Sequence, residues 1–208
     1  MPYWAQPRET REMDQPQPAA ALIRIRGVDD LHPDGQYSAL AKWFHWTTVP
    51  LLVLAILTGL VIRFIKDDVK MPFYALHESL GLIILALAVA RLAWRLLSKP
   101  PALPDHIPPG MRRAANAVHH LLYAALIIQP LLGFFTTNAY GFPLQGQTAF
   151  LGFIDLPKFM EAHETLALVL HWGHSLIGWA LPFLIAAHVA GAIHHHALRK
   201  DGTLLRML

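Results

Sequence analysis

Residues 174–188 read HSLIGWALPFLIAAH, an apolar run with a histidine at each end and no charged residue between them. The surrounding residues 165–198 contain no Asp, Glu, Lys or Arg. A helix that crosses a bilayer needs about 20 mostly apolar residues, because lipid supplies no water to satisfy the backbone. The stretch therefore predicts a membrane-spanning helix, in which each imidazole needs a partner.

Three further apolar runs extend this prediction to the rest of the chain, which has 208 residues, 54% of them hydrophobic and 15% charged. We expect four spanning helices at about 43–65, 73–97, 114–137 and 165–195, forming an all-α, integral membrane four-helix bundle. Residues 37–208 make one domain. Residues 1–36 mix Pro, Gln and charges, which is typical of a mostly disordered tail. The segment LPKFMEAHE at 156–164 is expected to form a short interfacial helix.

The basic residues predict the orientation, because positively charged flanks tend to stay in the cytoplasm. Of the 17 Lys and Arg residues, 13 lie in the N-terminal tail, the connection between the second and third spans, and the C-terminus. We therefore expect both termini to be cytoplasmic and the protein to lie in the bacterial inner membrane. This distribution explains the basic character of the chain as topology and attraction to lipid, and nothing in it points to nucleic acid.

Histidine must carry any metal chemistry, since the chain has 13 His and no Cys. His174 and His188 are 14 residues apart, about 21 Å along a helix and on nearly the same face. Antiparallel helices place a partner for each. His45 begins the first span at the depth of His188 toward the cytoplasm, and His77 begins the second at the depth of His174 toward the periplasm. The sequence thus predicts two facing histidine pairs at two depths.

Opposed imidazoles from neighbouring helices suit bis-histidine ligation of haem, whereas zinc usually takes three or four clustered ligands. A hydrogen-bonded histidine without any ligand remains the alternative for a single pair. His163 is about 37 Å from His188, too far for both to lie in the hydrocarbon core, and His171 is one turn before His174. His119 is expected at an interface or a quinone site. Room for a cofactor is expected from five glycines in the spans: Gly59, Gly81, Gly133, Gly178 and Gly191.

Several motifs over residues 37–208 resemble the bacterial cytochrome b561 family. They are YSALAKWFHW at 37–46, LHESLG at 76–81, HLLYAALIIQPLLG at 120–133 and AAHVAGAIHHHALRKDGTLLRML at 186–208. The resemblance implies four transmembrane helices and two b-type haems, each held between two histidines. Its ligands fall on His45, His77, His174 and His188. HETLA at 163–167 also looks like the family's ligand motif, but His163 lacks the spacing of 14 residues to His188.

The resemblance further implies electron transfer in the respiratory chain, with ubiquinone as the substrate on one side and, in some members, superoxide as the electron donor. Arg63, Lys66 and Lys70 would then attract an anion to the outer site or bind haem propionates, and Arg91 and Arg95 are candidates for inner propionates. The partners expected are membrane lipid, quinone and a soluble redox protein. Two alternatives stay open: a membrane anchor of a larger dehydrogenase or hydrogenase-like complex, and a histidine-lined metal transporter.

Overall fold

The computed structural model describes residues 35–98, 100–102, 107–141 and 149–208. Four long helices dominate it: α1 (Ala39–Phe64), α2 (Lys70–Leu97), α3 (Pro109–Tyr140) and α4 (Glu164–Ile193). Each is long and apolar enough to cross a membrane. The predicted all-α membrane bundle is therefore confirmed. The expected tail falls almost entirely on residues 1–34, which lie outside the described residues.

Local chemistry explains where the helices begin and end. Ser38 caps α1 by accepting a hydrogen bond from the Ala41 backbone N–H at 3.3 Å, as N-cap hydroxyls do. Pro109 occupies the first turn of α3, where its missing N–H costs nothing. The same helix ends at Gly141, whose φ of 82° is the left-handed conformation that glycine adopts without strain. These signals frame each apolar run with polar or flexible residues.

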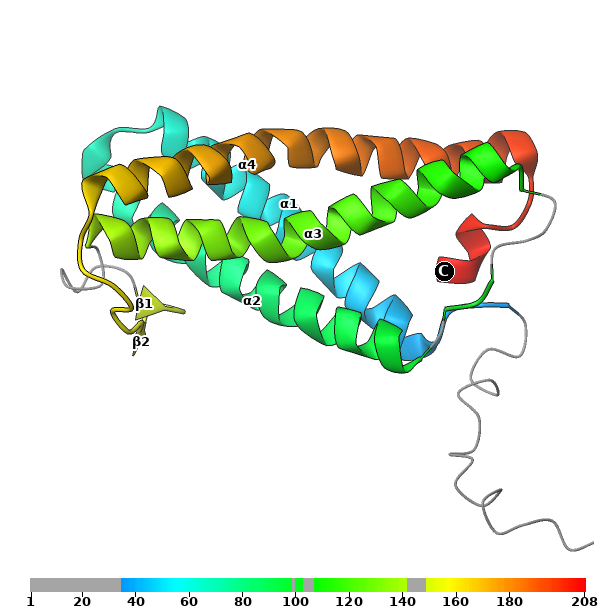
Figure 1. The fold of residues 1–208 in the computed structure, drawn as a ribbon, viewed down its shortest axis with the longest axis horizontal. Helices are drawn as coiled ribbons and strands as arrows, with labels where there is room; N and C mark the ends of the chain where they lie inside the picture. The colour runs from blue at the N-terminus through cyan, green and yellow to red at the C-terminus, as the bar shows by residue number, and fades with distance from the viewer. Residues whose placement is uncertain (1–34, 99, 103–106, 142–148) are drawn as a thin grey trace, which may run out of the picture.

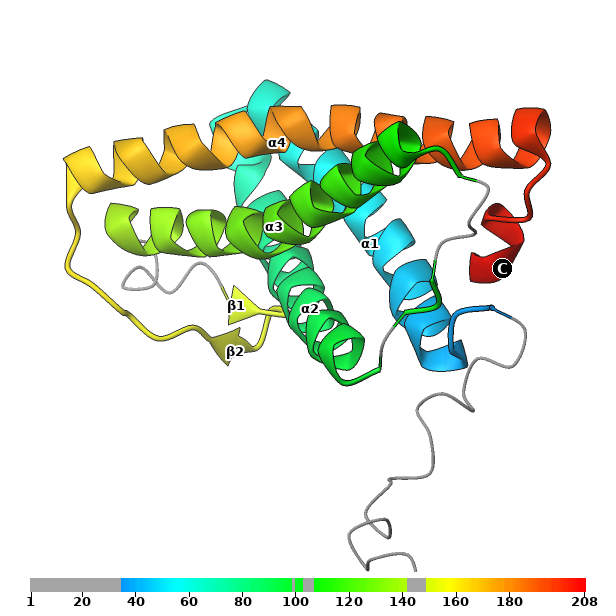
Figure 2. The ribbon, with the colours of Figure 1, turned by 45° about the vertical axis from the view of Figure 1, so that its right-hand side comes forward.

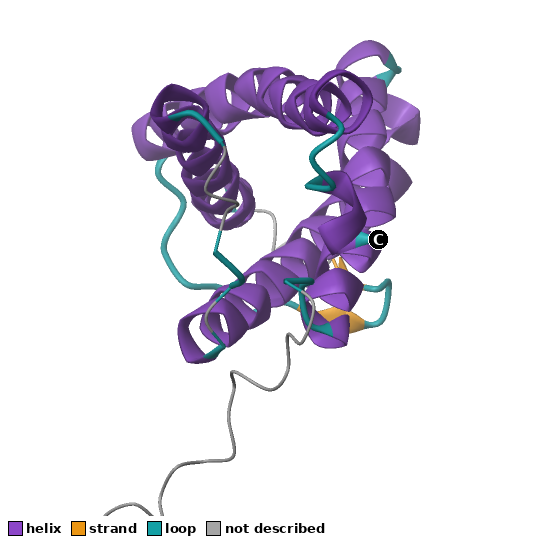
Figure 3. Ribbon diagram, turned by 90° about the vertical axis from the view of Figure 1, so that its right-hand side faces the viewer, coloured by secondary structure: helices purple, strands orange, loops and turns teal. Residues whose placement is uncertain are grey.

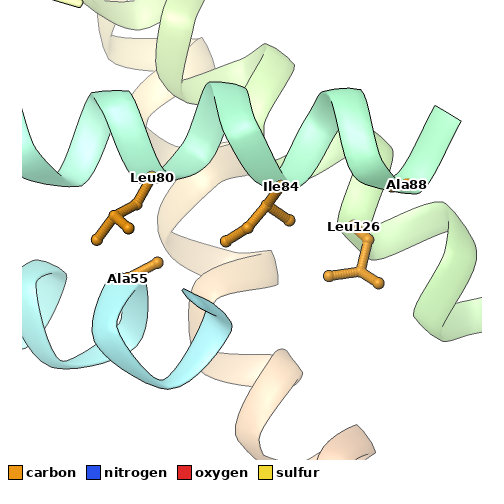
Figure 4. Packing of buried hydrophobic residues seen from close by; sticks show 5 residues of the cluster. All are labelled: Ala55, Leu80, Ile84, Ala88 and Leu126. Carbon is orange, nitrogen blue, oxygen red and sulfur yellow. The ribbon is translucent and has the colours of Figure 1, made fainter. Parts of the chain in front are cut away.

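The helices pack in sequence order, α1 along α2, α2 against α3 and α3 along α4. Figures 1 and 2 show that α1 and α2 cross α3 and α4 at an angle, and Figure 3 shows the helices as a ring when viewed along the bundle. A small apolar cluster joins α1, α2 and α3 (Figure 4), made of Ala55, Leu80, Ile84, Ala88 and Leu126. Many large apolar side chains instead face outward, as expected of a protein whose solvent is lipid.

One end of the bundle, here called the terminal end, brings together segments that are far apart in the sequence. The Tyr37 N–H donates to the Arg206 carbonyl at 3.0 Å. The Arg206 guanidinium donates to the Ala102 carbonyl at 2.8 Å, and the Trp46 indole N–H donates to the Met207 carbonyl at 2.9 Å. The C-terminal helix η6 (Leu204–Met207) therefore closes this end, beside the start of α1 and the α2–α3 connection (Figure 1).

A buried carboxylate organises the turn that leads into η6. After α4 the chain continues as a short π-helix, η5 (His194–Arg199). Asp201 then accepts hydrogen bonds from the His195 ring at 2.5 Å and the Thr203 N–H at 3.1 Å. Burial acts to raise the pKa of Asp201, but these hydrogen bonds outweigh it and hold the pKa well below its usual range. The stabilisation is present at neutral pH and is lost only as the pH falls through the lowered pKa.

The opposite end, here called the loop end, departs from the expectation at residues 156–164. The predicted interfacial helix is wrong, because the chain from 156 to 163 is irregular. Its backbone is tethered to the last turn of α3 instead: Phe159 N–H donates to the Asn138 side-chain oxygen at 2.8 Å, and His163 N–H donates to the Ala139 carbonyl at 2.9 Å. A two-stranded hairpin, β1 (Ala149–Phe150) with β2 (Ile154–Asp155), precedes it.

Asn138 is the side chain on which this tether depends. It is 1% exposed, and its amide also donates to the Phe134 carbonyl at 3.2 Å. We expect Asn138→Ala to lower the free energy of unfolding by about 1–3 kcal/mol, because Phe159 N–H loses its acceptor and the space of the buried Asn138 amide is left unfilled. Thermal unfolding in detergent measures this change. Lys158→Ala, which removes an exposed ion pair with Glu161 from the same connection, is the control and should cost less than about 1 kcal/mol; equal losses would contradict the assignment.

Candidate functional site

His77 of α2 and His174 of α4 face each other across the loop-end half of the bundle. Their ring centroids are 6.0 Å apart and the ring planes are nearly perpendicular, at 87°. Nδ1 of His77 lies 2.9 Å from the Ala55 carbonyl oxygen, and Nδ1 of His174 lies 3.0 Å from the Gln129 carbonyl oxygen. Since a carbonyl only accepts, each Nδ1 carries the proton. Each Nε2 therefore keeps a lone pair for a ligand.

Two glycines make room for these rings. A Cβ atom at Gly59 would lie 3.0 Å from Cε1 of His77, and one at Gly133 would lie 2.9 Å from Cε1 of His174. The contact at Gly133 is closer than real Cβ atoms come, and the contact at Gly59 is tighter than nine in ten of them, so a side chain at either position would force the imidazole to shift. Five glycines were expected to leave room for a cofactor. Two of them, Gly59 and Gly133, also leave room for the imidazoles of His77 and His174.

A cavity of about 830 Å³ surrounds the His77–His174 pair and is lined by all four helices. Four of the five glycines line it, namely Gly59, Gly81, Gly133 and Gly178. Its walls are mainly apolar, while Arg63, Lys70 and Glu78 supply charged groups. Glu78 accepts a hydrogen bond from Thr137 at 3.0 Å. Of the three cations predicted to lie near an anion, Lys66 is not among the lining residues.

His45 of α1 and His188 of α4 form the second pair, in the terminal-end half. Their ring centroids are 6.1 Å apart with 68° between the planes. A third imidazole is close by, because the His119 ring of α3 lies 5.2 Å from the His188 ring. His119, which was expected at an interface or a quinone site, thus lies beside the second pair. The sequence left this contact hidden because the third span was expected to begin at about residue 114, which put His119 near its start, whereas α3 begins at Pro109.

Two arginines of α2 lie near this second pair. Arg91 and Arg95 both place their guanidinium groups over the Tyr123 ring of α3, at 5.4 and 5.7 Å from its centroid. Arg91 also acts electrostatically on His45, His119 and His188. Positive charge is therefore concentrated beside the terminal-end pair, where an anionic group of a cofactor would be stabilised.

The remaining histidines near the spans have other partners. His163 is the N-cap of α4, and its ring nitrogen accepts a hydrogen bond from Leu166 N–H at 3.2 Å. His171 lines the cavity and lies 3.5 Å from the Ser175 hydroxyl. His120 is exposed and bonds the Asn116 carbonyl at 2.6 Å. Neither His163 nor His171 replaces His174 opposite His77.

The geometry of both pairs fits a haem better than a bare metal ion. Two imidazoles on opposite sides of one iron, each bonded at about 2 Å, hold their ring centroids roughly 6 Å apart. Both pairs have this separation, and the first has a cavity of suitable size beside it. Among the residues that the structure describes, no group of three or more His, Asp or Glu side chains is arranged to hold a metal ion.

Comparison with known proteins identifies the family. The family model for prokaryotic cytochrome b561 matches residues 36–208. The chain belongs to this family. Its membership in the cytochrome b561 family makes the protein a membrane cytochrome, with haem b as the implied cofactor and electron transfer as its function.

Curated relatives of this cytochrome b561 family member cover most of the chain. Cytochrome b561 homolog 1 of Escherichia coli K12 is 31% identical over 179 residues, which are 83% of this chain and 97% of the relative. Cytochrome b561 homolog 2 of the same organism is 29% identical over 178 residues, 83% of this chain and 91% of the relative. The probable superoxide oxidase CybB of Yersinia pestis is 28% identical over 178 residues, which are 83% of this chain and 96% of the relative.

Sequence reasoning missed the groups that hold the ligands in place. The carbonyls of Ala55 and Gln129 orient the imidazoles of His77 and His174, but a backbone acceptor leaves no mark in the sequence. Gln129 is a partial exception. Its polar side chain stands just before Pro130 in an otherwise apolar run, and its amide nitrogen lies 3.4 Å from Nε2 of His174. A single Gln in the middle of an apolar span could therefore have indicated a nearby polar site.

Proposed function

We propose that this protein is a di-haem b-type cytochrome, with one haem site at His77 and His174 and the other at His45 and His188. The observation that carries the proposal is the pair of facing imidazole pairs, at 6.0 and 6.1 Å between ring centroids, at two levels of one bundle. Buried imidazoles are costly in a membrane unless something binds them. A ligand shared by each pair removes that cost at both levels.

The protein's own part in this function is to fix the ligands. Donation from Nδ1 to a backbone carbonyl sets the tautomer and the ring orientation, and it makes Nε2 a stronger ligand. Ala55 and Gln129 do this for the first pair, and Gly59 and Gly133 keep the space open. When bound, haem b supplies reversible one-electron chemistry, which bis-imidazole ligation and a dry pocket adjust in potential.

The proposed location is the bacterial inner membrane, with both termini in the cytoplasm. The terminal end carries the N-terminal segment, the α2–α3 connection and the C-terminus together. Its basic residues include Lys42, Arg112, Arg113, Arg199 and Lys200. The positive-inside rule places that end in the cytoplasm. The His45–His188 pair is then the inner site, and the His77–His174 pair is the outer site.

For the reaction, we propose electron transfer from superoxide at the outer site to ubiquinone. Two superoxide ions each lose one electron and become dioxygen, while one ubiquinone gains two electrons and two protons and becomes ubiquinol. The relative named as a probable superoxide oxidase supports this choice of donor. So does Arg63 in the lining of the outer cavity, because positive charge around a redox site raises the local concentration of an anion. Lys70 also lines the cavity, but it pairs with Asp67 at 2.7 Å.

A histidine-lined metal transporter is the competing function. It is disfavoured because the described histidines near the two levels pair across the bundle at a separation that suits one shared iron, and because two imidazoles alone make a poor site for a divalent ion. Purified transporter would be colourless and bind divalent cations.

The first prediction concerns cofactor content. A reduced-minus-oxidised absorption spectrum with haem quantitation should show two b-type haems in each chain. We expect His77→Ala or His174→Ala to remove one haem, and His45→Ala or His188→Ala to remove the other, because each variant lacks one axial ligand. His120→Ala, at an exposed histidine, is the control and should keep both. A colourless wild-type protein expressed with ample haem would rule out the proposal.

The glycines beside the outer pair allow a second prediction. In Gly133→Ala the new methyl group would press on His174, so the ring must rotate away from its ligating position. We expect this variant to lose most of the outer haem while keeping the inner one, as measured by haem per chain and by the amplitude of the spectrum. Gly191→Ala is the matched control, since a Cβ at Gly191 meets nothing within 4 Å. Full haem content in Gly133→Ala would show that the ring position is not critical.

The superoxide reaction is tested by charge removal. We expect Arg63→Gln to slow superoxide-dependent ubiquinone reduction by a factor of about 3 to 10 at low salt, and to weaken its dependence on ionic strength. Lys158→Gln removes a cation from the connection between α3 and α4, at the same end of the bundle, without touching the cavity lining, and should change the rate little. If the wild-type protein consumes no superoxide at any salt concentration, the donor is another molecule, while the haem proposal is unaffected.

A further inference from the structure

The hairpin between α3 and α4 has an unusual turn. Strands β1 and β2 pair antiparallel, with Phe150 opposite Ile154. Leu151 and Gly152, in the turn, both have left-handed backbones, with φ of 55° and 81°. Hairpins favour β-turns with left-handed central residues when these are Gly, Asn or Asp, but a bulky residue in this conformation is uncommon and strained. Leucine at this position therefore needs a reason beyond the turn itself.

A spanning helix holds this turn in place. The Leu151 N–H donates to the Ser79 hydroxyl oxygen of α2 at 2.9 Å. Ser79 is buried and donates in turn to the Ala75 carbonyl at 2.6 Å. The Phe153 N–H donates to the Phe150 carbonyl within the hairpin at 3.3 Å. These backbone donors are thus satisfied without water, which is what an environment of lipid demands.

The point of attachment lies inside the spanning part of α2. Ser79 is nine residues, or about 13 Å, along the helix from its first residue, Lys70. Figures 1 and 2 show the hairpin beside α2, on the side away from α4. Leu76, one turn before Ser79, is an exposed apolar residue of that helix. The hairpin therefore adjoins the lipid-facing surface of the bundle, and its contact with α2 lies farther along the spanning helix than the first residue, Lys70.

The hairpin presents apolar side chains outward. Phe153 is 74% exposed, and Leu151 and Ile154 are also exposed. Phe159, in the segment that follows, is exposed as well and packs on Phe134 and Phe135 of α3. We propose that the hairpin tip, Leu151–Ile154, is a membrane-contacting element that inserts into the lipid interface at the loop end, with acyl chains and headgroup carbons as its partner.

Lipid fits this surface better than a soluble partner does. A contact with water would leave the large apolar side chains of Leu151, Phe153 and Ile154 exposed at a strained turn, which costs hydration free energy without compensation. Burial of these side chains at the boundary of headgroups and acyl chains recovers that free energy. Lys158, the described cation nearest in the sequence, pairs with Glu161 at 2.6 Å, so this cation is already engaged and is not a free contact for an acidic partner.

The absence of cysteine from the chain makes a direct test simple. Single-cysteine variants Phe153→Cys, Glu161→Cys and Leu176→Cys are labelled with the environment-sensitive fluorophore NBD, and the full-length protein is reconstituted in nanodiscs of phosphatidylcholine and phosphatidylglycerol. Glu161 lies in the connection outside the spanning helices and its side chain is 89% exposed, whereas Leu176 is exposed within the spanning helix α4. They calibrate the water and lipid ends of the scale. Far-UV circular dichroism checks that each variant is folded.

We expect the label at Phe153 to emit at a wavelength close to that of Leu176→Cys, to be quenched by lipids that carry a nitroxide near the headgroup, and to resist aqueous iodide. Emission and iodide quenching like those of Glu161→Cys would overturn the proposal, since the tip would then face water. A blue-shifted label that neither quencher reaches would also overturn it, because protein would then cover the tip. The inference does not depend on the haem proposal or on the electron donor.

Discussion

The absence of water inside a bilayer is the constraint on which the rest of this structure depends. It requires every backbone group to be satisfied within the protein, which is why the chain forms four long helices. It also makes an unpartnered imidazole costly. His77 and His174 meet that requirement on one side with the carbonyls of Ala55 and Gln129. The Nε2 side of each ring keeps the lone pair that a cofactor would take, at His174 in place of the Gln129 amide 3.4 Å away, so the same constraint that shapes the fold also prepares the candidate ligands.

The two levels meet this constraint in different ways. At the level of His77 and His174, backbone carbonyls and glycines fix the rings beside a mainly apolar cavity. At the level of His45 and His188, a third imidazole and two arginines stacked on Tyr123 surround the pair. Positive charge next to a redox centre favours its reduced form, and an apolar pocket disfavours net charge. Two chemically similar ligand pairs thus occupy electrostatically distinct environments within one bundle.

Much of the fold and the arrangement of the four candidate ligands could be predicted from the sequence. Apolar length located the helices, and helical periodicity with antiparallel packing brought His45 to His188 and His77 to His174. These inferences work because they depend only on helix geometry and on the bilayer. Features held by single tertiary contacts were not predictable. The tether of Phe159 to Asn138 replaced the expected helix at 156–164, and the hairpin turn at Leu151 depends on one hydroxyl of α2.

His163 shows how spacing and local motif can disagree. HETLA at 163–167 looks like a ligand motif of the family, whereas a separation of 14 residues from His188 favours His174. Fourteen residues turn a helix through nearly four full turns, so His174 and His188 share a face at depths about 21 Å apart. In α4, one continuous helix of 30 residues, His163 lies outside the first turn and caps it. An imidazole that accepts a backbone N–H there has its ring committed to the helix end, and the residue that the helix carries to the depth of His77 is His174.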